Sequence, residues 1–385
     1  MKPMRLYAAS LVCLSLVACG GGSGSSPQPD TKPTVSSSAA TNLASLGATA
    51  ISADSATESF DVVASIGDTW RLSVVKATGA YTLTPNNSLY GLTQETGTLA
   101  RTVAGDLVNY VLANKVNLSQ DTRTGALVGT MTVGSQTATV SGTPYQVSDA
   151  TKLAGTYTFM GTSRDKGTSA SPEFFAGQIL ISSDGATATF CVGGKVDSAG
   201  GCLDVDTTDT NTPQKATINL VKETGTNGGF YKMTAVGSDN QAHDWGNLMV
   251  QNGNLGTVLL IDRFGNGDNG TSSTVRVGNF YAVKAQTLAG TELDGSWKCG
   301  TGNGTATLAI NGTTNAVSNP NETPSSWNEA LSFNSVNSSN GGLVSFPSYV
   351  VTTYQNSGSL ILPLSASLMA IENQSVNGIS LCSKQ

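Results

Sequence analysis

The sequence has few charged residues, which make up only 12% of its 385 positions. That share is about half of what soluble proteins usually carry. The chain has no run of Lys and Arg that could neutralise phosphates, and its formal net charge is −6. Nucleic-acid binding and electrostatic docking on an anionic membrane surface are therefore excluded as leading interpretations.

The sequence also has few of the residues and motifs that are typical of catalytic sites. It has a single histidine, His243, and it contains no Gly-x-Ser-x-Gly elbow and no Cys-x-x-Cys pair. A Ser–His–carboxylate site would need a distinctive serine near that histidine, and no serine stands out from the serine-rich background. We predict that His243 is exposed or hydrogen-bonded near a hairpin, and we assign no catalytic residue and no metal site.

No apolar run is long enough for a membrane-spanning helix, which needs roughly 20 residues. The longest candidate is the amino-terminal segment, where Lys2 and Arg5 precede a mostly apolar run from residue 6 to residue 18. A short basic start followed by such a run is typical of a secretory signal peptide. We therefore predict that residues 1–18 are a signal peptide.

The signal ends in Leu16-Val17-Ala18-Cys19, followed by Gly20. This tetrapeptide resembles the lipobox of bacterial lipoproteins. The resemblance implies that Cys19 receives a thioether-linked diacylglycerol, becomes the new amino terminus after cleavage, and is acylated again, for example with palmitate. It also implies an envelope protein anchored in the outer membrane, because no Asp follows the modified cysteine, and facing the periplasm or the cell surface.

Residues 19–42 are rich in Gly, Ser, Thr and Pro. Such a segment has too little apolar surface to offset the entropy lost on ordering, so we predict a disordered tether. Its root-mean-square reach would be on the order of 25–30 Å. Two or three acyl chains on Cys19 would give lasting attachment, whereas a single chain binds membranes only marginally.

Four cysteines remain after Cys13 leaves with the signal and Cys19 is lipidated. An even number in an oxidising compartment indicates two disulfides, for which three pairings exist. We favour Cys191–Cys202, which would close a local glycine-rich loop, and Cys299–Cys382. The second bridge would join the start of the last domain to its end, as in a sheet whose first and last strands are neighbours.

After the tether, apolar residues alternate with period two, and no segment shows a convincing helical period. We predict an all-β fold of two or three tandem antiparallel β-barrel or β-sandwich domains, covering residues 43–150, 151–287 and 288–385. Hairpin turns are expected at residues 134–135, 184–185, 252–253 and 311–312, where glycine pairs with Ser, Asp or Asn. Asn-Gly and Asp-Gly suit type I′ turns, in which both central residues need a positive φ.

The last two segments open alike, with Leu153-Ala-Gly-Thr-Tyr157 and Leu293-Asp-Gly-Ser-Trp297, and residues 66–70 are a looser echo. A Leu-x-Gly-x-aromatic start before a hairpin meander is similar to the opening of lipocalin and avidin-type barrels. In those families the aromatic side chain plugs or lines one end of the barrel. The resemblance implies repeated small β-barrels.

Acidic residues offer two further interpretations. Paired carboxylates could serve glycoside hydrolysis, and the candidates are Glu173, Asp204, Asp206, Asp209, Asp262 and Asp268. Calcium, as the only cofactor considered, favours oxygen ligands from Asp/Asn/Gly loops, and two such loops cover residues 204–211 and 262–270. Loops of this composition are first of all turns.

We predict a lipid-anchored, non-enzymatic cell-envelope protein that works by binding or display, with the membrane as its one assigned partner. Two alternatives stay open. One is a small-ligand binder that uses a barrel interior, and the other is a hydrolase of envelope or extracellular glycans. A filled interior would favour display, an open apolar cavity would favour ligand binding, and a cleft with two acids would favour the enzyme.

Overall fold

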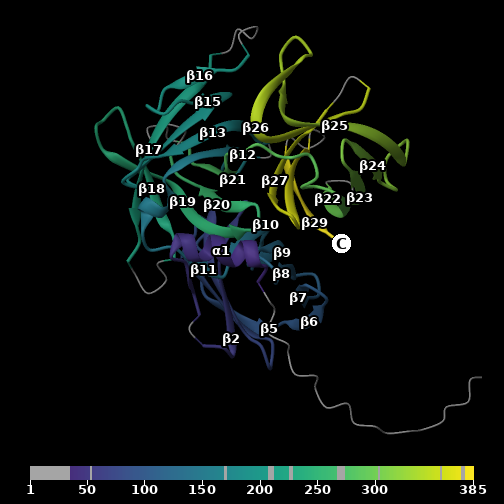
Figure 1. The fold of residues 1–385 in the computed structure, drawn as a ribbon. Coiled ribbons are helices and arrows are strands. Elements are labelled where there is room, and N and C mark those ends of the chain that lie inside the picture. The colour runs from purple at the N-terminus through teal and green to yellow at the C-terminus, as the bar shows by residue number, and fades with distance from the viewer. Residues whose placement is uncertain are drawn as a thin grey trace, which may run out of the picture. The chain divides into compact units, whose positions relative to one another are not determined.

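The computed structural model describes residues 35–52, 54–168, 171–206, 212–224, 229–266, 274–301, 304–355, 358–373 and 378–385. Residues 34–385 form one compact unit. Almost all regular structure in the described residues is antiparallel β-sheet, so the predicted all-β class is confirmed. Three large sheets follow one another along the chain (Figure 1), and β1 (Thr49–Ala50) pairs with β11 (Tyr145–Gln146) in a two-stranded sheet. The exact predicted boundaries between domains stay predictions.

The first sheet, here the N-terminal sheet, has nine strands. In spatial order these are β5 (Glu95–Thr98), β4 (Ala80–Asn87), β3 (Asp68–Val75), β2 (Thr57–Ala64), β10 (Gln136–Thr143), β9 (Leu127–Val133), β8 (Val116–Asp121), β7 (Leu107–Leu112) and β6 (Ala100–Ala104). The two edge strands, β5 and β6, are separated in sequence by Leu99 alone. The sheet must therefore curl until its edges are neighbours, which makes it a nearly closed barrel.

The second sheet, here the middle barrel, is closed. Its strands are β12 (Gly155–Asp165), β13 (Glu173–Ile181), β14 (Thr187–Val192), β17 (Gln214–Lys222), β18 (Tyr231–Val236), β19 (Ala242–Gly253), β20 (Gly256–Arg263) and β21 (Arg276–Lys284). A 3-10 helix, η1 (Ala150–Leu153), leads into it, and a small hairpin of β15 (Gly194–Val196) and β16 (Cys202–Asp204) is inserted after β14.

The third sheet, here the C-terminal barrel, is also closed. Its strands are β22 (Gly295–Thr301), β23 (Gly304–Asn311), β24 (Thr314–Ser318), β25 (Ser326–Asn337), β26 (Leu343–Thr353), β27 (Leu360–Ser365), β28 (Leu368–Asn373) and β29 (Gly378–Lys384). Pairing of β22 with β29 closes the barrel and places Cys299 opposite Cys382. Closure gives every strand of this sheet two neighbours.

Both barrels are plugged in the same way at the end where their first strand begins. Tyr157 and Trp297 are almost fully buried. The Tyr157 hydroxyl donates to the Leu153 carbonyl (2.8 Å) and the Trp297 indole N–H donates to the Leu293 carbonyl (2.7 Å). The repeated Leu-x-Gly-x-aromatic opening thus places the aromatic ring inside a barrel end, as the resemblance implies.

A lysine of the closing strand completes each plug. Lys284 Nζ lies 4.9 Å from the centre of the Tyr157 ring, and Lys384 Nζ lies 5.6 Å from that of Trp297. Each lysine is the registered partner of its aromatic residue. A cation over an aromatic face is attracted by the ring quadrupole, so the last strand contributes to the plug as well as to the ladder.

Apolar side chains fill both barrels and the seams between the sheets. Inward-facing residues form one core in each barrel, and outward-facing residues of all three sheets form a further shared core. On β20, Leu259 and Ile261 face the barrel interior, whereas Val258 and Leu260 face the shared core. A strand buried on both faces reads as a continuous apolar run instead of an alternating one.

The end of the predicted tether is a helix, which corrects the prediction that residues 19–42 are disordered throughout. Helix α1 (Ser37–Leu46) begins after Ser36, whose hydroxyl accepts from the Ala39 N–H, and ends at Gly47 in the left-handed conformation. Asn42 donates to Asn252 of β19 (2.9 Å). The helix was missed because the residues that it buries, Ala39 and Leu46, are too few for a visible helical period. In the described part of the chain, no helix has the length and hydropathy of a membrane span.

A second correction concerns the hairpin expected at residues 252–253. Strand β19 continues through Gly253, which pairs with Gly256, so the turn lies two residues later at residues 254–255. Asn252 is buried, with 2% of its surface exposed. Its bond to Asn42 of α1 gives its side chain a partner in the strand. Packing therefore outweighs the turn preference of Asn-Gly at this position.

A buried polar row joins the N-terminal sheet to the middle barrel. Asn247, Asp262 and Asn279 are registered neighbours on β19, β20 and β21. The Thr69 hydroxyl of β3 donates to Asp262 Oδ2 (2.7 Å) and accepts from Asn247 Nδ2 (2.9 Å). Asp262 Oδ1 has no hydrogen-bond partner among the described residues. Burial raises the pKa of the Asp262 carboxyl well above its ordinary value, and nearby Asp68 adds to the rise.

The raised pKa predicts how stability responds to pH. Because the folded protein holds the Asp262 proton more tightly than the unfolded chain does, this carboxyl costs increasing stability as pH rises above 3.8, until the pKa of the folded state is passed. Asp262→Asn mimics the neutral acid, so we expect it to raise the melting temperature at neutral pH. The gain should vanish near pH 4, as measured by thermal unfolding across pH.

Asp244→Asn is the matched control, because Asp244 is half-exposed and pairs with Lys232 at the surface of β19. It should leave the melting temperature at neutral pH close to that of the wild type, because an exposed ion pair contributes little to stability. A destabilised Asp262→Asn protein at neutral pH would show that the buried carboxyl is ionised and would contradict this account.

Candidate functional site

The candidate site lies at one end of the C-terminal barrel, here the barrel mouth. In an up-and-down barrel the connections alternate between the two ends, so the β24–β25 and β26–β27 loops share the end opposite the Trp297 plug. A pocket of about 200 Å³ opens there. Its lining residues are Glu322, Thr323, Pro324, Trp327, Glu329, Thr352, Tyr354, Gly358 and Ser359.

Strand alternation explains why polar side chains point inward at this end. Leu331 and Trp327 both contact the barrel core, and Glu329 between them has the same period-two orientation. Asn315 of β24 is the registered partner of Glu329, so it also faces inward. The mouth is thus the polar rim of an otherwise apolar interior.

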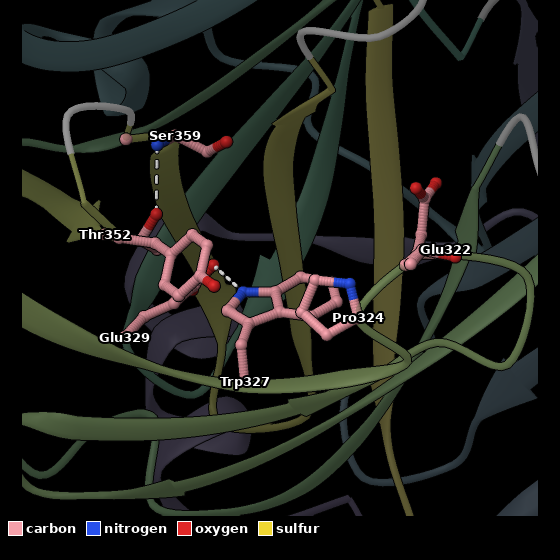
Figure 2. A pocket seen from close by; sticks show the side chains of 9 residues that line it. Glu322, Pro324, Trp327, Glu329, Thr352 and Ser359 are labelled. Carbon is pink, nitrogen blue, oxygen red and sulfur yellow. Dashed lines mark hydrogen bonds between the residues drawn. The ribbon is translucent and has the colours of Figure 1, made fainter.

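Two aromatic rings form the walls of the pocket. The ring centres of Trp327 and Tyr354 lie 6.0 Å apart with an interplanar angle of 46°. Both side chains are half-buried. Pro324 lies beside the indole in Figure 2, and Glu329 and Glu322 are seen on opposite sides of it.

Two neutral donors hold the Glu329 carboxylate in place. The Trp327 indole N–H donates to Oε1 and the Asn315 amide donates to Oε2, both at 2.9 Å (Figure 2 shows the first of these bonds). Asn315 is 1% exposed, and its Oδ1 accepts no hydrogen bond from the described residues. These bonds fix the orientation of both the carboxylate and the indole ring before any ligand arrives.

The far wall is fixed by a short backbone bridge. The Ser359 N–H donates to the Thr352 hydroxyl oxygen (2.9 Å), and the Thr352 N–H donates to the Ser359 carbonyl (2.9 Å). Figure 2 shows the first of these two bonds. The Thr352 oxygen accepts from the backbone, and among the described residues it donates to none, so its O–H can donate to a ligand.

Below the mouth, the barrel is filled. Inward-facing residues from all eight of its strands pack against one another; they include Trp297, Leu308, Val317, Leu331, Val350, Ile361, Met369 and Cys382. A ligand could enter the mouth but could not occupy the interior without displacing this core. The sequence-based alternative of a ligand held inside a barrel is therefore not favoured for this barrel.

A second pocket of about 400 Å³ lies between the middle and C-terminal barrels. Asp206 and Glu372 both line it. The Asp206 carboxylate accepts from the Ser339 N–H (2.6 Å) and the Glu372 carboxylate accepts from the Leu360 N–H (3.1 Å). Burial raises the pKa of Glu372. Since both carboxylates contribute to loop or strand structure, we do not take this pocket as the primary site, and the glycan-hydrolase alternative stays a prediction.

The four cysteines of the described residues form the two disulfides that the sequence analysis favoured. Cys191 is bonded to Cys202, with Cα atoms 5.4 Å apart, and Cys299 is bonded to Cys382, with Cα atoms 4.1 Å apart. The first bridge ties the inserted hairpin to β14, and the second joins the two strands that close the C-terminal barrel. Cys19 lies outside the described residues.

The single histidine and the described candidate hydrolase acids have separate partners. His243 contacts the Asp239 carboxylate (2.9 Å) beside the β18–β19 turn, as expected for a hydrogen-bonded hairpin residue. Glu173 is an exposed partner of Arg276 on the middle barrel. Asp204 accepts from the Asp206 N–H within a turn. Asp209 and Asp268 lie outside the described residues.

The calcium interpretation requires one correction. Asp262 does not belong to a loop, as the 262–270 interpretation assumed, because it lies on β20 and is buried against Thr69. Most of the remaining proposed ligands of both loops lie outside the described residues. Within the parts of the chain that the structure describes, no three His, Cys, Asp or Glu side chains gather as a metal site would require.

Sequence reasoning missed Trp327, Glu329 and Tyr354. A signal was present in residues 327–331, where Trp-x-Glu-x-Leu alternates on one strand face. A carboxylate between two inward-facing apolar residues indicates that the strand is near the end of the barrel, where inward-facing side chains can reach solvent. To use this signal one must know which strand ends meet at the same end of the barrel, and the sequence does not give that information.

No family model and no curated protein matches the chain. Among solved structures, a Transferrin Binding Protein B from Haemophilus parasuis matches at 10% identity and a TM-score of 0.20, covering 83% of this chain and 65% of that one. The β subunit of a DNA polymerase from Streptococcus pyogenes matches at 12% identity and a TM-score of 0.12, covering 90% and 96%. The chain thus spans just under two thirds of the first protein's length. Likeness at this level carries no argument about function.

Proposed function

We propose that the protein is a lipid-anchored, non-enzymatic binding module of the cell envelope, held in the outer membrane through Cys19. The signal-like leader, the Leu16–Cys19 tetrapeptide and the polar segment that follows support the anchor. Two or three acyl chains would suffice for stable attachment. The scarcity of basic residues leaves the lipid as the membrane contact that this sequence best supports.

The barrel mouth carries the binding part of the proposal. It combines two aromatic walls, a fixed carboxylate and hydroxyl donors around a pocket of about 200 Å³, while the barrel beneath is filled. Pre-oriented polar groups around an apolar wall are typical of ligand sites. Binding at such a rim needs no catalytic group, in keeping with the absence of an activated nucleophile from the sequence patterns.

Metabolic labelling with a radioactive fatty acid tests the anchor. In the bacterial host, wild-type protein should incorporate label and remain with the membrane fraction. Cys19→Ser should lose the label and leave the membrane, because the thioether can form only at that sulfur. Cys13→Ser is the matched control and should label like the wild type, since Cys13 is removed with the signal.

Equal labelling of the wild type and Cys19→Ser would contradict the anchor, and so would an unlabelled wild type. Neither result depends on what the barrel mouth binds, so the two parts of the proposal can fail separately.

A further inference from the structure

The barrel mouth has the electrostatic character of a site for positive charge. Its lining includes two carboxylates, Glu322 and Glu329, and none of its described lining residues is Lys, Arg or His. Among the described residues, Glu329 accepts from the neutral N–H groups of Trp327 and Asn315, and no ion pair joins it to a described basic residue. The negative charge of this carboxylate is therefore oriented but not neutralised.

The aromatic walls attract the same kind of ligand. The face of an indole or phenol ring carries negative potential, and a cation within about 6 Å of the ring centre is stabilised by it. Trp327, whose ring gives the strongest such interaction, and Tyr354 have their centres 6.0 Å apart. A cation in the pocket can contact both rings and the Glu329 carboxylate at once.

The size of the pocket limits the ligand to a head group. Sites for whole drug-sized ligands enclose roughly 300–1,000 Å³, whereas this pocket encloses about 200 Å³. Aromatic walls suit a weakly hydrated organic cation better than a metal ion, whose oxygen ligands would have to surround it. The rest of such a ligand would extend out of the mouth.

We propose that the barrel mouth binds an alkylammonium head group, held against Trp327 and Tyr354 by cation–π attraction and by the charge of Glu329. This inference rests on the proposed binding function and specifies its ligand class. Both primary and quaternary ammonium groups share this chemistry. The hydroxyl of Thr352 can orient a neighbouring polar group of the ligand.

Calorimetric titration of the full-length protein, purified in a polyoxyethylene detergent that carries neither sugar nor ammonium, tests the proposal. The probes are choline chloride, n-butylammonium chloride and 3,3-dimethylbutan-1-ol, the neutral isostere of choline. We expect saturable binding of choline, of butylammonium or of both. The neutral isostere should bind at least about tenfold more weakly, because it lacks the charge on which cation–π attraction depends.

Two matched variants locate the site. Glu329→Gln keeps the shape of the side chain and removes its charge. It should weaken choline binding by about tenfold, which is the usual size of one lost interaction with a charged group. Glu173→Gln removes one negative charge from the exposed rim of the middle barrel and should bind choline like the wild type. Thermal unfolding of both variants checks that they are folded.

Three results would overturn the inference. The first is no binding of either cation at about 100 mM, far above a millimolar Kd. The second is equal affinity for choline and its neutral isostere. The third is saturable binding of a neutral sugar, such as methyl glucoside, with no response to either cation. This third result would keep the mouth as a binding site and replace only its ligand class.

Discussion

Trp297→Ala is expected to lower the free energy of unfolding by about 3–5 kcal/mol, the usual cost of removing a large buried aromatic side chain. Trp297 is fully buried, and its indole N–H donates to the Leu293 carbonyl. The substitution removes the ring that plugs the barrel end and the surface on which Lys384 lies. Chemical denaturation monitored by circular dichroism measures the loss.

Trp327→Ala is the matched comparison, since it makes the same substitution at the opposite end of the same barrel. Trp327 is half-buried, so its removal should cost clearly less stability than that of Trp297. Equal losses for the two variants would contradict the assignment of one tryptophan to the plug and the other to an open mouth.

Removal of the Cys299–Cys382 bridge, as Cys299→Ala/Cys382→Ala, should destabilise the protein by about 4.5 kcal/mol in the chain-entropy model. The bridge spans a sequence separation of 83 residues and joins the two strands that close the C-terminal barrel. Without it, the unfolded chain regains the conformations that the long loop had lost. Unfolding under non-reducing conditions measures the difference.

The Cys191→Ala/Cys202→Ala protein is the control for this effect. Its bridge spans only 11 residues, so the same model gives about 2.8 kcal/mol. Removal of the long bridge should therefore lower the free energy of unfolding more than removal of the short bridge. A larger loss from the short bridge, or no loss from the long one, would show that loop length does not govern the contribution of these disulfides.

Features that depend on local pattern could be predicted from the sequence. The Leu-x-Gly-x-aromatic openings predicted barrel starts through their resemblance to lipocalin and avidin-type barrels. In the structure Gly155 and Gly295 both have a φ above +110°, a backbone that favours glycine. The pairing of Cys299 with Cys382 followed from the idea that first and last strands are neighbours. Both inferences needed only short stretches of sequence and the topology of a closed sheet.

Features that depend on contacts between sheets could not be predicted. Asp262 was placed in a loop because its neighbours include Asn and Gly, yet Thr69 of a different sheet holds it on a strand. Asn252 was placed in a turn, yet Asn42, 210 residues away in sequence, bonds to it. In each case a hydrogen bond to a residue far away in the sequence stabilises the observed conformation, and local propensity cannot reveal that bond.

The candidate site falls between these cases. The alternation of Trp327, Glu329 and Leu331 is visible in the sequence. What decides its meaning is that Glu322, Thr323 and Pro324 line one pocket together with Tyr354, Gly358 and Ser359. There the ring centres of Tyr354 and Trp327 lie 6.0 Å apart. The strand could be predicted, and the pocket required the structure.

The central claim is that a ligand is received at the barrel mouth while the barrel interior stays closed. Indole ¹⁵N–¹H signals of the four tryptophans, recorded during a choline titration, test it most directly. Loss of one signal in Trp327→Phe assigns the mouth residue. We predict that choline shifts the Trp327 signal and leaves those of Trp70, Trp245 and Trp297 in place, because these three are buried. An unmoved Trp327 signal, or a shift confined to the buried tryptophans, would contradict the account.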